Sequence, residues 1–280
     1  MKLRLLLALF LLAAIANAAF RLESLDVVIS VNTDGSAHVS ENIVIAINTT
    51  DSIAIYDAIM ATTNDISSWK RRTGMSEIRQ HFDSSLVTLK NVKVTPQPRD
   101  TCGAYVANCY SILKNYGMLK IEYDVYPVIE ANGSVKRGSG LFKVEQYKPR
   151  TINYTLNQKA LSFETYENEN FLPAGITLTM RLPPDAIITQ LSPTPQPNEE
   201  LEFPIKEKTF LKWNGPRSLG GLEIAFQRRE SLASEITDFF RDWQAITMKF
   251  IYSSEGIAAI AIAVVALISA FVLRRNLKTE

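Results

Sequence analysis

The chain has 280 residues, of which 46% are hydrophobic and 21% are charged, and its formal net charge is only +1. This composition allows one large domain or two modest ones. It provides no broad basic face, so nucleic-acid binding has no electrostatic support. Apolar residues are concentrated at the two ends of the chain, and these ends decide the predicted topology.

Residues 1–18 have the features of a secretory signal peptide. Lys2 and Arg4 precede an apolar stretch over 5–15 that is too short to span a bilayer. Ala16-Asn17-Ala18 supplies the small side chains that signal peptidase accepts. We therefore expect cleavage after Ala18, and the alternative is an uncleaved N-terminal anchor.

Residues 256–273 contain no charged side chain, and three basic residues follow them: Arg274, Arg275 and Lys278. At about 1.5 Å per residue, a helix of this length matches the hydrocarbon thickness of a bilayer. Basic residues stay on the cytoplasmic side, so we predict one transmembrane helix with a cytoplasmic tail at 274–280. The expected location is the cell membrane, with residues 19–255 outside. A buried soluble helix is the alternative, but such helices are seldom apolar all round over this length.

The chain has two cysteines, Cys102 and Cys109. In an exported protein an isolated pair at this spacing predicts a disulfide. A zinc site lacks ligands, because His38 and His81 are far away in sequence, and the spacing is not that of a C-x-x-C redox motif. We predict no metal site and no cofactor.

Three Asn-x-Ser/Thr sequons begin at Asn48, Asn132 and Asn153. They are candidates for glycosylation on an exported surface. Asn132 precedes a glycine and is expected to lie in a turn.

The outer region alternates apolar and polar residues, which is typical of β-strands. Asp34-Gly35 between two such stretches is the strongest hairpin signal, because glycine tolerates the positive φ of a tight turn. Residues 64–82 break the pattern and predict short helices or an elaborated loop. Strands are expected at 25–31, 37–47, 87–94, 118–126, 151–156, 161–166, 176–182, 186–191, 208–213 and 222–228.

The expected fold class is mainly β, with two tandem β-sandwich domains. The first covers 19–148 with the insertion at 64–82, and the second, Ig-like, covers 149–230. The boundary is placed at Lys148-Pro149-Arg150. One large sandwich is the alternative.

From residue 231 the apolar spacing changes to four and three residues, which predicts an amphipathic juxtamembrane helix over 231–252. The apolar seam is formed by Leu232, Ile236, Phe239, Trp243, Ile246 and Phe250. The seam could bind a partner helix. Packing on the second sandwich or on the membrane surface is favoured, because fewer than three heptads are short for a coiled coil.

The sequence contains no recognisable catalytic or nucleotide-binding motif. Two S-x-x-K strings, Ser67 to Lys70 and Ser111 to Lys114, have no supporting motif and are ascribed to chance. His81 follows a basic stretch and is expected on a solvated helix face. We predict no catalytic residue.

Four segments resemble uncharacterised prokaryotic, especially archaeal, membrane proteins with β-sandwich outer regions. The first is V-x-I-x-V-x-x-D-G-S-A-x-V-x-E from Val27 to Glu41. The others are L-P-P-D-A from Leu182 and the pair L-K-W-N-G from Leu211 and L-E-I-A-F from Leu222. The resemblance implies fold and location, and it implies no activity.

These observations predict a non-enzymatic, membrane-anchored cell-surface protein that serves as a binding or scaffolding module or as an accessory subunit of a membrane complex. Its expected partners are the lipid bilayer and a protein or glycan, contacted through 64–82, the loop between Cys102 and Cys109, and the proline-rich loop at 193–197. The alternatives are an extracytoplasmic hydrolase and a structural envelope component. An enzyme should show a polar cleft with paired titratable groups.

Overall fold

The computed structural model describes residues 19–62, 64–100, 115–148, 150–166, 169–196, 203–206, 208–229, 244, 247–249 and 252–253. Several sequence predictions lie outside these residues. They are the signal peptide with Ala18, the pair Cys102 and Cys109, the seam residues Leu232, Ile236, Phe239, Trp243, Ile246 and Phe250, the predicted span at 256–273, and Arg274, Arg275 and Lys278. Among the helices in the described part of the chain, none combines the length and the apolar character needed to cross a membrane.

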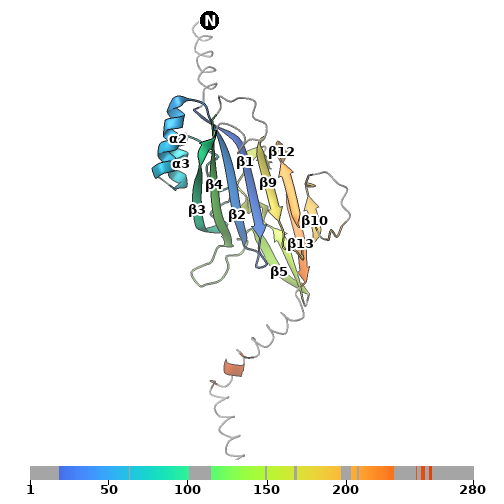
Figure 1. Cartoon of the computed structure of the whole chain (residues 1–280). Coiled ribbons are helices and arrows are strands. Elements are labelled where there is room, and N and C mark those ends of the chain that lie inside the picture. The colour runs from blue at the N-terminus through green and yellow to red at the C-terminus, as the bar shows by residue number, and fades with distance from the viewer. Residues whose placement is uncertain are drawn as a thin grey trace, which may run out of the picture. The chain divides into compact units, whose positions relative to one another are not determined.

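The chain is mainly β, as predicted, and its largest sheet has six strands in the order β11-β9-β1-β2-β4-β3 (Figure 1). These strands are β1 (Phe20–Val31), β2 (Ala37–Ile47), β3 (Val87–Asp100), β4 (Asn115–Pro127), β9 (Ile176–Arg181) and β11 (Phe210–Asn214). All the pairs in this sheet are antiparallel except that of β1 with β9.

Two smaller sheets complete the β-structure. One has the order β10-β13-β6-β5, and the other has the order β12-β8-β7. Their bounds are β5 (Phe142–Lys148), β6 (Thr151–Leu156), β7 (Glu164–Tyr166), β8 (Glu169–Leu172), β10 (Ile187–Ser192), β12 (Arg217–Ser218) and β13 (Glu223–Arg229), and a 3₁₀ turn η1 covers Gln158–Ala160.

The expectation of two separate sandwiches needs correction. Strands β9 and β11 follow the predicted boundary, yet they belong to the same sheet as β1, β2, β3 and β4. Leu25 to Ser30 of β1 lie beside Ile176 to Arg181 of β9 in parallel register. One apolar core joins residues from both sides of the boundary. Alternation along a strand shows which face is buried, but it does not show which distant strand is the neighbour, so the pairing of β9 with β1 could not be predicted.

By chain contacts the residues fall into two compact units: Met1–Tyr147 with Ile152–Arg228, and Lys148–Thr151 with Arg229–Glu280. The first unit contains the six-stranded sheet and most of the smaller sheets. The second unit includes the turn between β5 and β6 together with the chain that continues from the end of β13.

The predicted hairpin of β1 and β2 is confirmed. Gly35 has φ +83°, and the Asp34 carboxylate accepts a hydrogen bond from the Ser36 N–H at 2.9 Å. This Asx-type contact and the left-handed glycine produce the tight turn that the two strands require.

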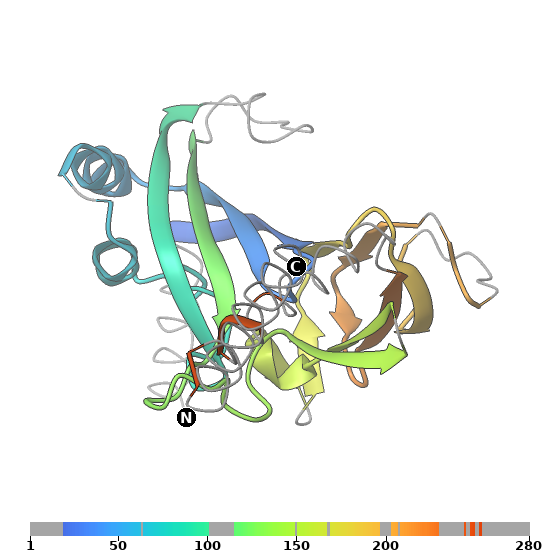
Figure 2. The ribbon, with the colours of Figure 1, turned by 90° about the horizontal axis from the view of Figure 1, so that it is seen from below.

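Two helices follow β2: α2 (Thr50–Thr62), which the sequence analysis did not predict, and α3 (Ile66–Thr73), which lies in the predicted 64–82 insertion. The α3 helix begins where Asp65 accepts a hydrogen bond from the Ser68 N–H at 2.8 Å, and it ends at Gly74 with φ +73°. Figure 2 shows both helices at the side of the sheet formed by β3.

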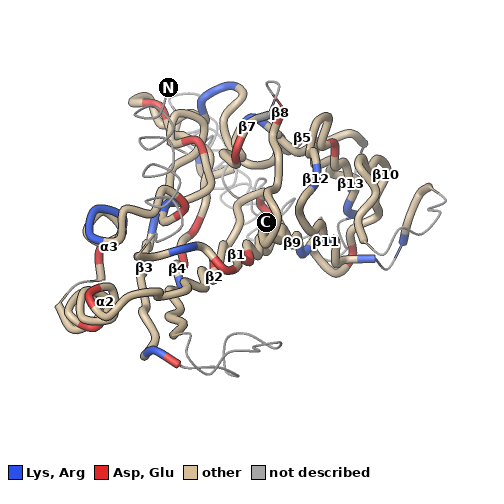
Figure 3. Tube along the Cα trace, turned by 90° about the horizontal axis from the view of Figure 1, so that it is seen from above, with Lys and Arg blue, Asp and Glu red and all other residues tan. Residues whose placement is uncertain are grey.

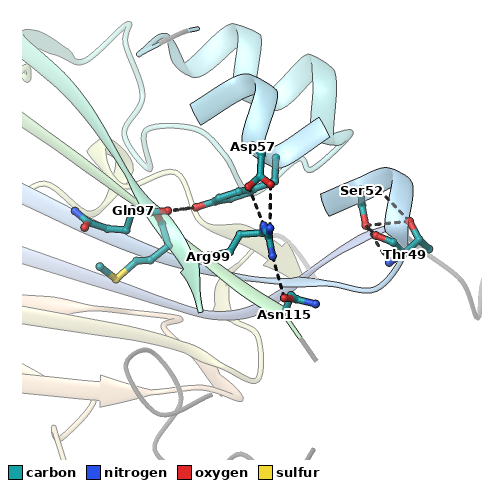
Figure 4. A network of polar contacts seen from close by, with 8 residues as sticks. Thr49, Ser52, Asp57, Gln97, Arg99 and Asn115 are labelled. Atoms are coloured by element: carbon teal, nitrogen blue, oxygen red, sulfur yellow. Dashed lines mark hydrogen bonds and ion pairs between the residues drawn. The ribbon is translucent and has the colours of Figure 1, made fainter. Parts of the chain in front are cut away.

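A polar network and one aromatic side chain attach α2 to the sheet (Figure 4). Arg99 of β3 donates two hydrogen bonds to the Asp57 carboxylate at 2.8 and 2.9 Å, and a third to the side-chain oxygen of Asn115 at 3.0 Å. The Arg99 guanidinium lowers the pKa of Asp57 through this hydrogen bond. Tyr56 is fully buried, and its hydroxyl donates to the Gln97 carbonyl at 2.7 Å.

The Tyr56 ring fits against β4 because position 117 has no side chain. An added Cβ at Gly117 would overlap the Tyr56 ring. We therefore expect Gly117→Ala to lower the free energy of unfolding by about 1–3 kcal/mol, as overpacking of a core does. Denaturant unfolding measures this loss. In a Tyr56→Ala background the same substitution should cost almost nothing, and an equal cost in both backgrounds would contradict the proposed contact.

Candidate functional site

Three polar side chains meet in the interior of the β-unit: Glu41 of β2, Tyr123 of β4, and His81 from the segment after α3. Their exposed fractions are 0%, 0% and 3%. Tyr123 lies opposite Val39 in the β2–β4 pairing, two positions from Glu41 and therefore on the same face of the sheet. A carboxylate in such a position is costly unless hydrogen bonds satisfy it.

The Glu41 carboxylate accepts hydrogen bonds from three donors. The His81 Nδ1 lies 2.9 Å from Oε2, the His81 backbone N–H donates to Oε1 at 3.1 Å, and the Tyr123 hydroxyl also donates to Oε1. An ionised carboxylate only accepts hydrogen bonds, so Nδ1 of His81 carries a proton. The second ring nitrogen, Nε2, is thereby left to face away from Glu41.

Burial raises the pKa of Tyr123 well above its ordinary value, and the negative charge of Glu41 raises that pKa further. The phenol therefore stays protonated and remains a donor to Glu41. Aromatic rings enclose the network: Phe163 stacks on His81 at 5.4 Å between ring centroids, and Phe82 meets Tyr123 edge-on at 5.9 Å.

His81 also forms part of the wall of a surface pocket of about 290 Å³. The pocket lies between α3 with the segment that follows it on one side and β7 and β9 on the other. Its lining residues are Lys70, Ser76, Glu77, Arg79, His81, Phe163, Glu164 and Ile176. Figure 3 shows the basic residues of α3 and the acidic β7 that contribute to this region.

A second, larger hollow of about 620 Å³ adjoins the first and shares Ser76, Glu77, Glu164 and Ile176 with it. It continues along the start of β1, from Ala19 to Leu22. The two hollows form one groove, which we call the His81 groove, with two cations, two carboxylates and a hydroxyl near its narrower part. Within the described part of the chain, the Arg79 guanidinium makes one long hydrogen bond, to the Ser162 hydroxyl at 3.5 Å, so its charge is available to a ligand.

The 64–82 segment was predicted to be a contact region, and it supplies five of the eight residues that line the smaller hollow of the groove. Its role in binding stays a prediction. The expectation that His81 lies on a solvated helix face is wrong, because its ring is buried on Glu41. Glu41 was not predicted as a site residue, although the sequence contains a signal for it. Glu41 is two residues from Val39 and from Ile43, so all three face the same side of β2, and all three are buried.

The other candidate residues are scattered. Ser67 and Lys70 both lie on α3 and are exposed, whereas Ser111 and Lys114 lie outside the described residues. His38 is half-exposed and contacts Asp124 at 2.8 Å. Within the described residues, no group of three or more histidine, cysteine or carboxylate side chains could hold a metal ion.

The sequons differ in accessibility. Asn48 and Asn132 are exposed, and Asn132 lies in the expected turn, where its side-chain oxygen accepts from the Ser134 N–H at 2.9 Å. Asn153 is half-buried in β6, and its side-chain oxygen has no hydrogen-bond partner among the described residues. In the proline-rich loop, the carbonyl of Pro193 accepts a hydrogen bond from the Trp213 indole at 2.9 Å, which ties the start of that loop to β11.

Comparisons with protein families and with curated proteins found no relative of this chain. No protein-family model matches the chain, and no curated protein is similar enough to count as related. The function is therefore inferred from the geometry of the site.

Glu41→Gln should destabilise the protein by about 1–3 kcal/mol, because the amide replaces one of the two acceptor oxygens with a donor, which then faces either the Nδ1–H of His81 or the His81 backbone N–H and the Tyr123 hydroxyl. The backbone N–H of His81 cannot reorient to accept. Denaturant unfolding measures the change. Glu122→Gln, on the neighbouring strand and in a half-exposed pair with Lys120, is the matched control and should cost less than about 1 kcal/mol. Equal costs would contradict the role given to Glu41.

Tyr123→Phe should change how stability depends on alkaline pH. The folded-state pKa of Tyr123 lies above its ordinary value of 10.0, so this group contributes stability that is present below pH 10.0 and lost as pH rises toward the folded value. Relative to the Phe variant, the wild-type chain should lose up to about 1.4 kcal/mol per pH unit above pH 10. Unfolding curves between pH 8 and 11 measure this, and a constant difference would contradict the assignment.

Proposed function

We propose that the protein is a membrane-anchored cell-surface binding module whose His81 groove binds a polar, negatively charged ligand of the acidic-saccharide class. The observation that supports this most directly is that Glu41 holds His81 and its segment in place beside Lys70 and Arg79. A binding wall fixed before the ligand arrives loses little conformational freedom on binding.

The groove chemistry fits such a ligand. Lys70 and Arg79 suit a carboxylate or sulfate group, and an arginine can bind it through two parallel hydrogen bonds. Glu77, Glu164 and Ser76 offer acceptors for sugar hydroxyls. Phe163 and Ile176 add apolar surface against which the face of a sugar ring can pack.

The membrane anchor is proposed from the sequence alone. The apolar segment at 256–273, the basic residues after it and the N-terminal signal pattern support it. With this orientation the β-unit and its groove lie outside the cell.

An extracytoplasmic hydrolase is the second candidate, and one observation favours it. A carboxylate that fixes Nδ1 of a histidine is the arrangement that positions a general base, and the Ser76 hydroxyl lines the same pocket. The side chain of His81 is, however, only 4% exposed, so a substrate reaches little of its ring. Binding is therefore preferred over hydrolysis.

The full chain in detergent micelles should bind oligosaccharides that contain uronic acids and should bind neutral oligosaccharides of the same length more weakly. Arg79→Gln should weaken that binding about tenfold or more, because it removes a charge-assisted pair. Arg71→Gln on the exposed face of α3, outside the groove, is the matched control and should bind like wild type. Calorimetric titration measures the affinities.

Two outcomes would overturn this proposal. If both arginine variants bind like the wild type, the groove is not the binding site. If mass spectrometry of the incubated saccharide shows shorter products that disappear in His81→Gln, the hydrolase is the correct function.

A further inference from the structure

The end of the β-unit that carries the β1–β2 turn has an unusual surface. Four large apolar side chains are exposed within a short stretch that covers the loop after β4 and strand β5. They are Ile129 (56% exposed), Val135 (57%), Val144 (40%) and Tyr147 (59%). We call this surface, residues 128–147, the apolar end. Ile129 and Val135 are bridge partners, and Val135 and Val144 line one pocket. Exposed apolar groups that are neighbours in this way mark a contact with another molecule or with a membrane.

Backbone hydrogen bonds within the loop after β4 fix the positions of Ile129 and Val135. Ile129 and Val135 face each other in an antiparallel bridge. The Glu130 N–H donates to the Ser134 carbonyl at 2.8 Å, and the Lys136 N–H donates to the Val128 carbonyl at 2.8 Å. The exposure of Ile129 and Val135 therefore belongs to an ordered hairpin.

Cationic side chains lie next to the apolar ones. Arg137 and Lys143 line a pocket of about 310 Å³ together with Ser139, Thr155 and Asn157. Lys143 forms an ion pair with Glu145 at 2.7 Å. Among the described residues none accepts a hydrogen bond from the Arg137 side chain.

Hydrogen bonds within the protein fix the backbone of this pocket before any ligand binds. The Asn157 side-chain amide donates to the carbonyl of Gly138 at 3.0 Å and to that of Gly140 at 3.1 Å, on either side of Ser139. Backbone fixed in this way keeps Arg137 at the rim, where its guanidinium can meet an oxyanion. A phosphate group suits such a site, because it presents oxygens to the planar donors of arginine.

The position of this surface in the fold identifies its occupant. β5 and β13 finish at the same end of the β-unit (Figure 1), and β13 is the last strand before the C-terminal part of the sequence. A second pocket, lined by Asp34 and Gly35 of the β1–β2 turn and by Lys143 to Glu145 of β5, shows that this turn and β5 are neighbours. The chain that continues from Arg229 contains the predicted membrane span at 256–273.

We propose that the apolar end rests on the surface of the phospholipid bilayer in which the chain is anchored, with Ile129, Val135 and Tyr147 at the level of the headgroups and Arg137 on a lipid phosphate. This inference depends on the membrane anchor of the proposed function, and it is independent of the ligand in the His81 groove. Tyrosine and arginine next to aliphatic side chains are the residues that contact a membrane interface.

Hydrogen–deuterium exchange of the full chain tests the contact. The chain in phospholipid nanodiscs is compared with the same chain in dodecyl maltoside micelles, which contain no phosphate. Amides of residues 128–147 should exchange roughly fivefold more slowly in nanodiscs, and amides of α3 should exchange equally in both. Inorganic phosphate added to the micelles should not reproduce the protection, because the source of the phosphate is the lipid.

Two variants and a control assign the protection to side chains. Val135→Ser and Arg137→Gln should each reduce the difference between nanodiscs and micelles by about half or more. Ile55→Ser removes an apolar side chain of 38% exposure on α2, away from the apolar end, and should leave the difference unchanged.

Equal exchange of 128–147 in nanodiscs and micelles would overturn the proposal, provided that the chain co-purifies with the nanodiscs. A chain that fails to co-purify would instead disprove the anchor. Protection by free phosphate alone would also overturn the proposal. A glycan found on Asn132 in the native protein would do the same, because Asn132 lies at the tip of this loop and a glycan would hold it away from the bilayer.

Discussion

The buried carboxylate of Glu41 is the constraint on which the rest of the site depends. A charge inside a β-unit is tolerated only when donors surround it, and here the donors come from β4 and from the segment after α3. By binding both the backbone and the ring of His81, Glu41 holds that segment on the sheet. The same contact positions His81 in one wall of the His81 groove, with Nε2 as the ring nitrogen that Glu41 does not contact.

The two proposed surfaces lie toward opposite ends of β1. The groove touches the start of this strand at Phe20 to Leu22, and the pocket beside the apolar end touches the turn that follows it, at Asp34 and Gly35. A strand rises about 3.3 Å per residue, so the ends of β1 are on the order of 35–40 Å apart. If the apolar end faces the bilayer, the groove opens at a distance from it, where an extracellular ligand can enter. The two proposed surfaces can therefore be occupied at the same time.

The β character, the first hairpin and most strand positions could be predicted because they depend on neighbours in the sequence. Asp34-Gly35 is sufficient to predict a turn, and alternation over 37–47 is sufficient to predict a strand with a buried face. The α2 helix was missed, since its start directly follows β2 and its buried residues are few: Ser52, Tyr56 and Ile59. Strand β5 was missed because Val144 and Tyr147 are exposed and no buried face alternates along it.

The sequence by itself determined the mainly β character and the segment at 64–82 as a departure from the β pattern, because local composition and periodicity carry these features. Export and anchoring stay predictions from the composition of the two ends. Only the tertiary structure decided that β9 pairs with β1 and that Glu41, His81 and Tyr123 meet. These contacts join residues 40 to about 150 positions apart. Such contacts depend on the packing of the whole β-unit, and no short window of sequence contains both partners.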